Sequence, residues 1–249
     1  MPASFDPAKI RAVLLDIEGT TTPIDFVFHT LFPYAAANVD KFLERHSGDI
    51  QVQSILEDLR RQHALDSASD PGVTPWVRGT LRQNLPSAAD YVRWLIARDS
   101  KITPLKTLQG TIWEEGYRRG ELKGQVYPDV PAALARWRRQ GIRIAIFSSG
   151  SVLAQQLLFK HSTAGDLSPS IEAYFDTITG AKREPSSYQK IAGALQLPAG
   201  QILFISDVIS ELDAARGAGT ATAQSLRPGI SPSSASTHPV ITDFNSLFS

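Results

Sequence analysis

The chain has 249 residues, of which 42% are hydrophobic and 20% are charged, and this balance predicts a packed core rather than disorder. Lysine plus arginine and aspartate plus glutamate each number 25, so no basic field indicates a nucleic-acid partner. Because cysteine is absent, disulfides, thiolate zinc sites and cysteine nucleophiles are excluded. The sequence shows no signal-peptide pattern and no apolar run of membrane-spanning length. We therefore expect no membrane partner and a cytoplasmic location, with the nucleus as well in a eukaryote.

The first predicted element is a buried strand, the apolar run Ala12–Leu15. It stops at Asp16, and a second carboxylate, Glu18, follows two residues later, before Gly19, three threonines and Pro23, which are typical of a loop. In open α/β sheets the ligand crevice lies at the carboxyl ends of the strands. Two carboxylates there can divide the work, one attacking or binding metal and the other moving protons. On these residues alone, an ordinary turn after a strand remains an alternative.

The next part of the chain, from Ile24 to about Gly124, has apolar residues at helical spacing and almost no strand-like alternation. We predict an all-helical insertion, interrupted by a loop over Ser67–Pro75, which contains glycine and two prolines. Ser87 with Asp90 three residues later resembles a capping box and predicts that a helix begins there.

The second half of the chain alternates strand-like and helix-like segments, which predicts a parallel sheet with helices on both faces. The fold class is thus α/β, a Rossmann-like core of residues 1–23 and 125–249 with an all-helical cap domain, residues 24–124, inserted after the first strand. A surface loop rich in serine and proline is predicted from Arg227 to Pro239. The predicted strands are residues 142–147, 174–178, 202–205 and 220–225, and the predicted helices are 129–139, 152–159, 187–195 and 211–216.

Polar residues of distinct kinds end three of these strands, and a loop carries a lysine: Asp16 with Glu18, Ser148-Ser149-Gly150, Asp207 and Lys182. Each has an ordinary alternative, namely a turn, a helix N-cap or a solvated surface lysine. Together they match what phosphoryl transfer needs. Asp16 is a nucleophile, and Asp16 with Asp207 offers hard oxygen ligands for Mg²⁺. Ser148 at a helix start can hold a phosphate, and Lys182 adds a positive charge.

In their order and strand context, these residues resemble the haloacid-dehalogenase-like hydrolases. Most phosphatases of that superfamily carry Asp-x-Asp in the first loop, whereas this chain has Asp16-Ile17-Glu18. With that departure, the sequence is similar to the acireductone synthase family, the bifunctional enolase-phosphatases of methionine salvage. The likeness runs from about Val13 to Gly219 and rests on separated segments that match in order: D-I-E-G-T-T-T-P-I, F-S-S-G, G-A-K-R-E-P-S-S-Y and I-S-D-V-I-S-E.

The resemblance implies a monomer with one Mg²⁺ per subunit that enolises 2,3-diketo-5-methylthiopentyl-1-phosphate and then hydrolyses it to 1,2-dihydroxy-3-keto-5-methylthiopentene and phosphate. It implies an aspartyl-phosphate on Asp16, proton transfer by Glu18, and metal ligation by Asp16, Asp207 and the Glu18 carbonyl. It also implies that Ser148 and Ser149 hold the phosphate, while Lys182 neutralises it and fixes Asp16. For Glu211, one helical turn from Asp207, we expect either an orienting role or that of an exposed helix-start carboxylate.

Other interpretations remain open at this stage. One is a phosphatase of the same fold that acts on another phosphorylated metabolite without an enolase step. A second is a binding module, because receiver domains also store a phosphoryl group on a strand-tip aspartate, although they lack a large insertion and a second carboxylate two residues on. The base of the enolisation is not assigned. Five aromatic residues are either contacts for the substrate tail or core of the helical domain: Phe26, Phe28, Trp76, Trp94 and Trp113.

Overall fold

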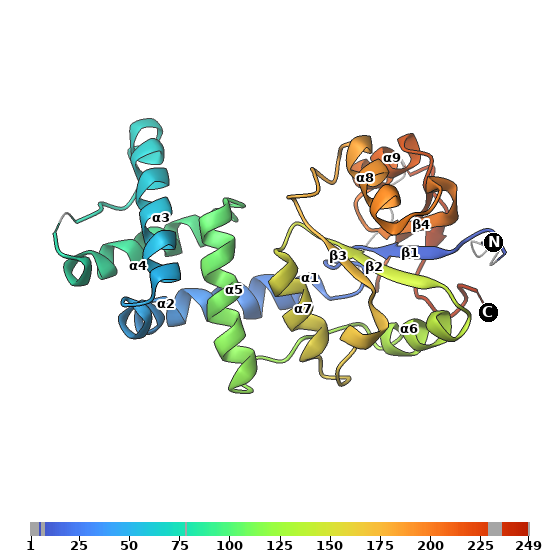
Figure 1. Ribbon diagram of the computed structural model, residues 1–249, viewed down its shortest axis with the longest axis horizontal. Helices are drawn as coiled ribbons and strands as arrows, with labels where there is room; N and C mark the ends of the chain where they lie inside the picture. The colour runs from blue at the N-terminus through green and yellow to red at the C-terminus, as the bar shows by residue number, and fades with distance from the viewer. Residues whose placement is uncertain (1–4, 6–7, 78, 229–235, 249) are drawn as a thin grey trace. The chain divides into compact units, whose positions relative to one another are not determined.

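The computed structural model describes residues 5, 8–77, 79–228 and 236–248. It divides into two compact units (Figure 1). We call Met1–Phe26 with Lys123–Ser249 the core unit, and Val27–Leu122 the helical unit. The chain leaves the core unit shortly after its first strand and returns to it at Lys123.

The core unit is built on a parallel sheet, which confirms the predicted α/β class. Among the described residues, six strands form this sheet in the order β3-β2-β1-β4-β5-β6. The first strand is central, because β1 pairs in parallel with β2 on one side and with β4 on the other. The strands are β1 (Ala12–Leu15), β2 (Arg143–Phe147), β3 (Ala173–Phe175), β4 (Ile202–Ser206), β5 (Ala221–Ser225) and β6 (Val240–Ile241).

Helices cover both faces of this sheet, with α8 and α9 on one face and α6 and α7 on the other (Figure 1). Side chains of a strand point alternately to the two faces. Leu14 packs with Tyr188 of α8 and Leu212 of α9 in one buried cluster, whereas Leu15 belongs to the opposite face. The helices are α6 (Val130–Arg139), α7 (Val152–Lys160), α8 (Pro185–Leu195) and α9 (Ile209–Gly217), with short 3-10 turns at η2 (Ser168–Ser170) and η3 (Ala199–Gln201).

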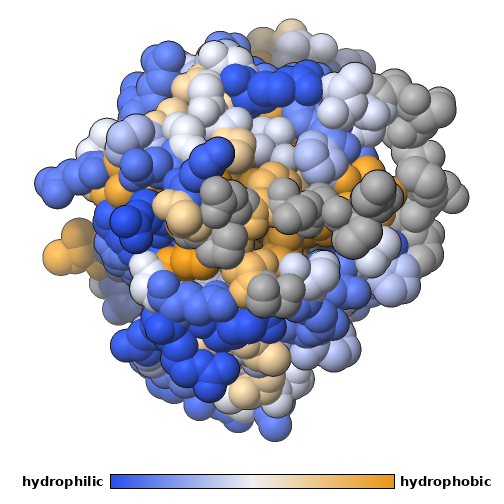
Figure 2. Space-filling view, turned by 90° about the vertical axis from the view of Figure 1, so that its right-hand side faces the viewer, coloured by the Kyte–Doolittle hydropathy of each residue, from blue (hydrophilic) through white to orange (hydrophobic). Residues whose placement is uncertain are grey.

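The surface of the core unit is mixed rather than broadly apolar. Figure 2 shows one face of the protein on which hydrophobic residues gather near the middle and hydrophilic residues surround them. Of the large hydrophobic residues described in this unit, Ile24, Ile178 and Val240 are exposed. The remaining large apolar side chains of the sheet and its helices are buried or half-buried.

The inserted segment is helical throughout its regular elements, as its spacing predicts. It follows α1 (Ile24–Phe26) with a π-helical turn, η1 (Val27–Leu31), and continues with α2 (Phe32–His46), α3 (Ile50–Ser69), α4 (Leu81–Ala97) and α5 (Thr103–Arg118). The helices bury most residues of the predicted apolar stripes, including Val39, Leu59, Val92 and Leu108, whereas Phe28 is exposed. None of the helices that the structure describes combines the length and the apolar character that crossing a membrane requires.

Two predictions in the inserted segment are wrong in position. The loop predicted from Ser67 begins only after Ser69, because the helical pattern continues until Asp70 N donates to Asp66 O. The helix predicted to begin near Ser87 begins at Leu81, where Thr80 and Gln83 form the capping box. Ser87 lies inside that helix and donates to the Asn84 carbonyl.

Two predictions in the core unit also need correction. The strand predicted over Tyr174–Ile178 ends at Phe175, because the Asp176 carboxylate then accepts a hydrogen bond from Ile178 N and turns the chain. Arg227, predicted to open a surface loop, is only 2% exposed. Part of that predicted loop, residues 229–235, lies outside the described residues.

Candidate active site

Three neighbouring strands bring the predicted polar residues to one edge of the sheet. Leu15 of β1 is in register with Ile146 of β2 and with Ile205 of β4. Asp16 therefore follows at the tip of the central strand, and its backbone N donates to the Ile205 carbonyl at 3.0 Å. Because the strands are parallel, Ser148 and Asp207 leave the flanking strands at the same edge, where open α/β sheets bind ligands.

The centre of this edge is a buried ion-pair cluster. Lys182 Nζ lies 2.6 Å from Asp16 Oδ1 and 2.6 Å from Glu211 Oε2. The hydroxyl of Ser206, the last residue of β4, lies 3.1 Å from Asp16 Oδ2 and 3.0 Å from Glu211 Oε2. Both oxygens of Asp16 are therefore engaged by the protein, and this fixes the orientation of the carboxylate.

Lys182 remains charged in this cluster. Burial opposes protonation, but the carboxylates of Asp16 and Glu211 outweigh it and raise the pKa of Lys182 above its usual value. The loop that carries the lysine is tied to α8, because the Tyr188 hydroxyl donates to the Lys182 carbonyl at 2.7 Å and Ser187 Oγ donates to the Ala181 carbonyl at 2.7 Å. The cation is thus held where it meets the aspartate, and it is not a solvated surface lysine.

Glu211 belongs to the same cluster and is not an exposed helix-start carboxylate. Its residue is 8% exposed, and its carboxylate contacts Lys182 and Ser206. Burial raises the pKa of Glu211, and the Lys182 charge opposes this shift. Glu211 thus competes with Asp16 for one cation and one hydroxyl.

Asp207 lies against the loop that follows β1. Gly19 has φ +69°, and a Cβ on it would lie 2.4 Å from Asp207 Oδ2, so only glycine fits this position without displacing the carboxylate. Unlike Asp16, Asp207 forms no ion pair within the described part of the chain. Burial, followed by the Asp16 charge, raises the pKa of Asp207 to about 7.

The cluster fits a hard divalent cation. The carboxylates of Asp16 and Asp207 lie close enough for the Asp16 charge to raise the pKa of Asp207, and Lys182 contacts Asp16, so two carboxylates offer oxygen donors at the ends of neighbouring strands. Oxygen donors of this kind are what Mg²⁺ prefers. No group of three or more His, Cys, Asp or Glu side chains is arranged as a metal site within the described residues. The predicted ligand set does not require one, because its third member is the Glu18 main-chain carbonyl.

Glu18 lies half-buried in a compact loop. The backbone N atoms of Thr21 and Thr22 both donate to the Ile17 carbonyl at 2.9 Å, and Gly19 N donates to Thr22 O at 2.9 Å. These bonds close a tight turn directly after the strand, so Glu18 lies within the loop that begins at the strand end.

Ser148 and Ser149, the two serines directly after β2, are not the N-cap of the following helix. Ser151 caps α7, since its Oγ accepts from Ala154 N at 3.3 Å. Ser148 is 5% exposed, and its Oγ accepts a hydrogen bond from Gly150 N at 3.2 Å. Gln155 closes this turn by donating to the Gly150 carbonyl at 2.8 Å. The alternative interpretation of Ser148 and Ser149 as an ordinary helix cap is therefore wrong.

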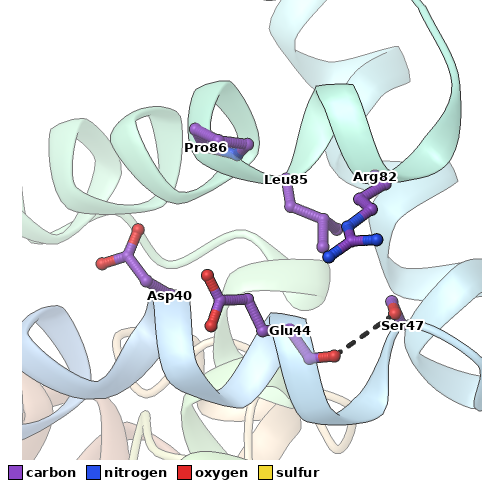
Figure 3. Close-up of a pocket in the computed structure, with 6 residues that line it drawn as sticks. All are labelled: Asp40, Glu44, Ser47, Arg82, Leu85 and Pro86. Atoms are coloured by element: carbon purple, nitrogen blue, oxygen red, sulfur yellow. Dashed lines mark hydrogen bonds between the residues drawn. The ribbon is translucent and has the colours of Figure 1, made fainter.

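The helical unit holds a pocket of about 590 Å³ that is separate from the ion-pair cluster of the core unit. Figure 3 shows the carboxylates of Asp40 and Glu44 pointing from α2 toward α4, which carries Arg82. None of the predicted site residues lines it. Ser47, Leu85 and Pro86 complete the lining.

The five aromatic candidates divide by burial. Phe26 and Trp113 are buried, and Trp113 Nε1 donates to the Leu31 carbonyl at 2.8 Å, which is the environment of core residues. Phe28 is 41% exposed. Trp76 and Trp94 are half-buried, and each lies within 6.0 Å of the Tyr91 ring.

A second titratable cluster lies in the helical unit. His46 Nδ1 lies 2.7 Å from Asp49 Oδ2, and its Nε2 lies 2.5 Å from Glu115 Oε1. Burial lowers the pKa of His46, but the two carboxylates outweigh it and raise that pKa above its usual value.

The sheet order and the aspartate–lysine cluster define a class of protein, the haloacid dehalogenase-like hydrolases, and a family profile with that description matches residues 10–219. An enolase-phosphatase E1 of Synechococcus elongatus is 52% identical over 90% of this chain and 91% of its own. The enolase-phosphatase E1 of Methylococcus capsulatus is 48% identical over 96% and 97%. The crystal structure of the UTR4 protein of Saccharomyces cerevisiae is 35% identical, covers 96% of this chain and 100% of its own, and has a TM-score of 0.76. The chain belongs to the enolase-phosphatase family of these hydrolases and is an enzyme.

Proposed function

We propose that this enzyme is a Mg²⁺-dependent enolase-phosphatase of methionine salvage, which converts 2,3-diketo-5-methylthiopentyl-1-phosphate into 1,2-dihydroxy-3-keto-5-methylthiopentene and phosphate. The relatives named enolase-phosphatase support the substrate. The observation that carries the proposal is the buried Asp16 carboxylate at the tip of the central strand, with Lys182 Nζ 2.6 Å from one of its oxygens.

In the proposed hydrolysis, Asp16 attacks the phosphorus in line and becomes an aspartyl-phosphate, while the substrate oxygen leaves. Lys182 and Ser206 hold the two carboxylate oxygens before the substrate arrives, so little reorientation is needed during attack. Ser148 and Ser149, with main-chain N–H groups at the start of α7, bind the phosphate oxygens.

Glu18 moves the protons in this proposal. It first donates a proton to the leaving oxygen and then removes one from the water that hydrolyses the aspartyl-phosphate. Asp16, Asp207 and the Glu18 carbonyl would hold Mg²⁺, which supplies charge neutralisation for the phosphate and polarisation for the diketone.

We further propose that residues 24–124 form a cap domain that excludes water from the reaction. The division of the chain into a core unit and a helical unit supports this assignment. The enzyme is proposed to act as a cytoplasmic monomer with one Mg²⁺ per subunit. Neither the contacts described above nor the relatives support a nuclear location.

A two-channel assay tests the function. The diketo phosphate is supplied with Mg²⁺, enol formation is followed by absorbance, and free phosphate is measured in parallel. We expect the enol signal to precede phosphate, and a chelator to abolish both. Phosphate release from other esters with no enol signal would leave a phosphatase of another metabolite and overturn the pathway assignment.

The nucleophile is tested with Asp16→Asn, which should lose phosphate release by at least about 10³-fold and keep the fold. Asp166→Asn makes the same chemical change at an exposed position away from the cluster and serves as the control. Wild-type turnover in Asp16→Asn would rule out the aspartyl-phosphate.

A further inference from the structure

The loop between Asp16 and Pro23 carries the reactive carboxylates, and two residues beyond the sequence motifs hold its main chain. Ser225, the last residue of β5, donates its hydroxyl to the Gly19 carbonyl at 3.2 Å. Arg227 donates twice to the next carbonyl, because its Nε and Nη2 lie 2.8 and 2.6 Å from Thr20 O. A guanidinium is therefore fixed on the backbone two residues after Glu18.

Arg227 is itself tightly held. Its Nη1 pairs with Asp129 Oδ2 at 2.8 Å, and the same Asp129 oxygen accepts from Phe244 N at 2.7 Å. The guanidinium carbon lies 4.4 Å from the ring centroids of both Tyr127 and Phe244. A buried arginine is costly unless its donors are satisfied, and here two of its donors are committed to a single loop carbonyl.

The same environment anchors the point where the chain re-enters the core unit. Tyr127, whose ring contacts Arg227, donates its backbone N to the Thr21 carbonyl at 2.9 Å. Adjacent carbonyls of the loop are thus held by Arg227 and by the backbone of its aromatic neighbour. Loss of the guanidinium would leave the Thr20 carbonyl buried without these two donors, and the loop would have to shift to find others.

We propose that Arg227 is a positioning residue of the active site, which holds the loop of Asp16 and Glu18 in its reactive geometry through the Thr20 carbonyl. Arg227 does not touch the reacting atoms in this proposal. Its kinetic consequence rests on the proposed phosphatase function, whereas its structural consequence, a loop held in place, does not.

The test compares two variants that both weaken the packing around this arginine. Arg227→Met keeps a long apolar side chain between the rings but cannot donate to Thr20 O. Phe244→Leu removes one ring contact and leaves the guanidinium on Thr20 O, so it controls for a general loss of stability. Arg227→Lys keeps the charge and a single donor group, and should recover part of any effect.

Hydrogen–deuterium exchange of residues 17–22 is the readout that needs no substrate. We expect exchange in Arg227→Met to be about tenfold or more faster in this loop, with β4 and α8 unchanged. Phe244→Leu should keep wild-type exchange in the loop. Wild-type loop protection in Arg227→Met, or equal loss in both variants, would overturn the proposal.

Steady-state phosphate release is the second readout. A displaced loop should lower kcat by about 10- to 100-fold in Arg227→Met and leave KM within about threefold, because binding contacts are kept while alignment is lost. Arg227→Lys should lie between Arg227→Met and wild type. A kcat of Arg227→Met within twofold of the wild-type value would also overturn the proposal.

Two precautions keep the outcome decisive. If the diketo phosphate is not a substrate, p-nitrophenyl phosphate replaces it, so a failure of the proposed function is distinguished from a failure of the positioning role. If Arg227→Met does not fold, Arg227→Lys decides alone: wild-type loop exchange together with wild-type kcat in that variant would refute the role of the bidentate contact.

Discussion

Removal of the Lys182 ammonium should destabilise the core unit strongly. The substitution Lys182→Met leaves Asp16 and Glu211, whose side chains are 7% and 11% exposed, without their shared cation. Breaking a buried ion pair by removing one partner costs about 3–5 kcal/mol, and here one cation serves two carboxylates. For a chain of this length, such a loss corresponds to a fall in Tm of roughly 6–20 °C.

Calorimetry in a chelating buffer measures this effect without interference from a bound metal. Lys190→Met, which removes an exposed lysine of α8, should change the free energy of unfolding by less than about 0.5 kcal/mol. The double variant Lys182→Met with Glu211→Gln should recover at least about 1 kcal/mol, because one of the two unpaired carboxylates is gone. A Tm for Lys182→Met within about 2 °C of wild type, or a double variant with no recovery, would refute the reasoning.

Three further predictions follow from the site and the helical unit. Glu18→Ala should slow hydrolysis of the proposed aspartyl-phosphate, so the acid-quenched variant should retain more labelled phosphate than the wild-type enzyme. An equal amount of label in both would contradict a role of Glu18 in that hydrolysis. Gly19→Ala should lose about 1–3 kcal/mol of stability and bind Mg²⁺ more weakly, because φ is +69° and a Cβ would lie 2.4 Å from Asp207 Oδ2. Calorimetry measures the stability and a Mg²⁺ titration measures the affinity. Unchanged values of both would disprove the close approach. Protonated His46 stabilises the fold, and because its folded pKa is raised, this contribution is complete below about pH 6.5 and is lost as pH rises through the folded value. Urea unfolding should therefore show about 0.5–1 kcal/mol lost on that rise in wild type but not in His46→Gln, and parallel pH profiles would count against it.

The sequence predicted the site where a residue type and a strand end coincide. Asp16 directly follows the apolar run of its strand and Asp207 follows the polar end, Ser206, of another, and the parallel pairing of these strands places both carboxylates at one edge of the sheet. Lys182 was predicted as a loop cation that adds a positive charge for phosphate oxygens, and its partner Glu211 was left between two roles. The burial of Glu211 could not be deduced because its helix, α9, has no clear apolar stripe that would show which of its faces packs against the sheet.

Other residues escaped prediction for physical reasons. In the sequence, Ser206 is only a polar residue at the end of a predicted strand. Its contact with Asp16 depends on the register of β4 beside β1, which the sequence does not show. Arg227 opens a stretch rich in serine and proline, and its burial depends on Phe244 and Tyr127, which are distant in sequence. The start of α4 was missed because Pro86 interrupts the helical pattern inside the helix.

The central position of β1 in the sheet has a consequence for synthesis of the protein. Leu15 is in register with Ile205, 190 residues later in the chain, so the first strand cannot complete its pairing until most of the chain has left the ribosome. At about 5–20 residues per second, β1 waits roughly 10–40 s for β4, the later of its two partner strands. The helical unit, Val27–Leu122, is synthesised in full before β2 begins at Arg143, so it can fold within that interval. Even after β2 has paired with one side of β1, the other side stays unpaired until β4 arrives, and such an open strand edge is a site for chaperone binding or for aggregation.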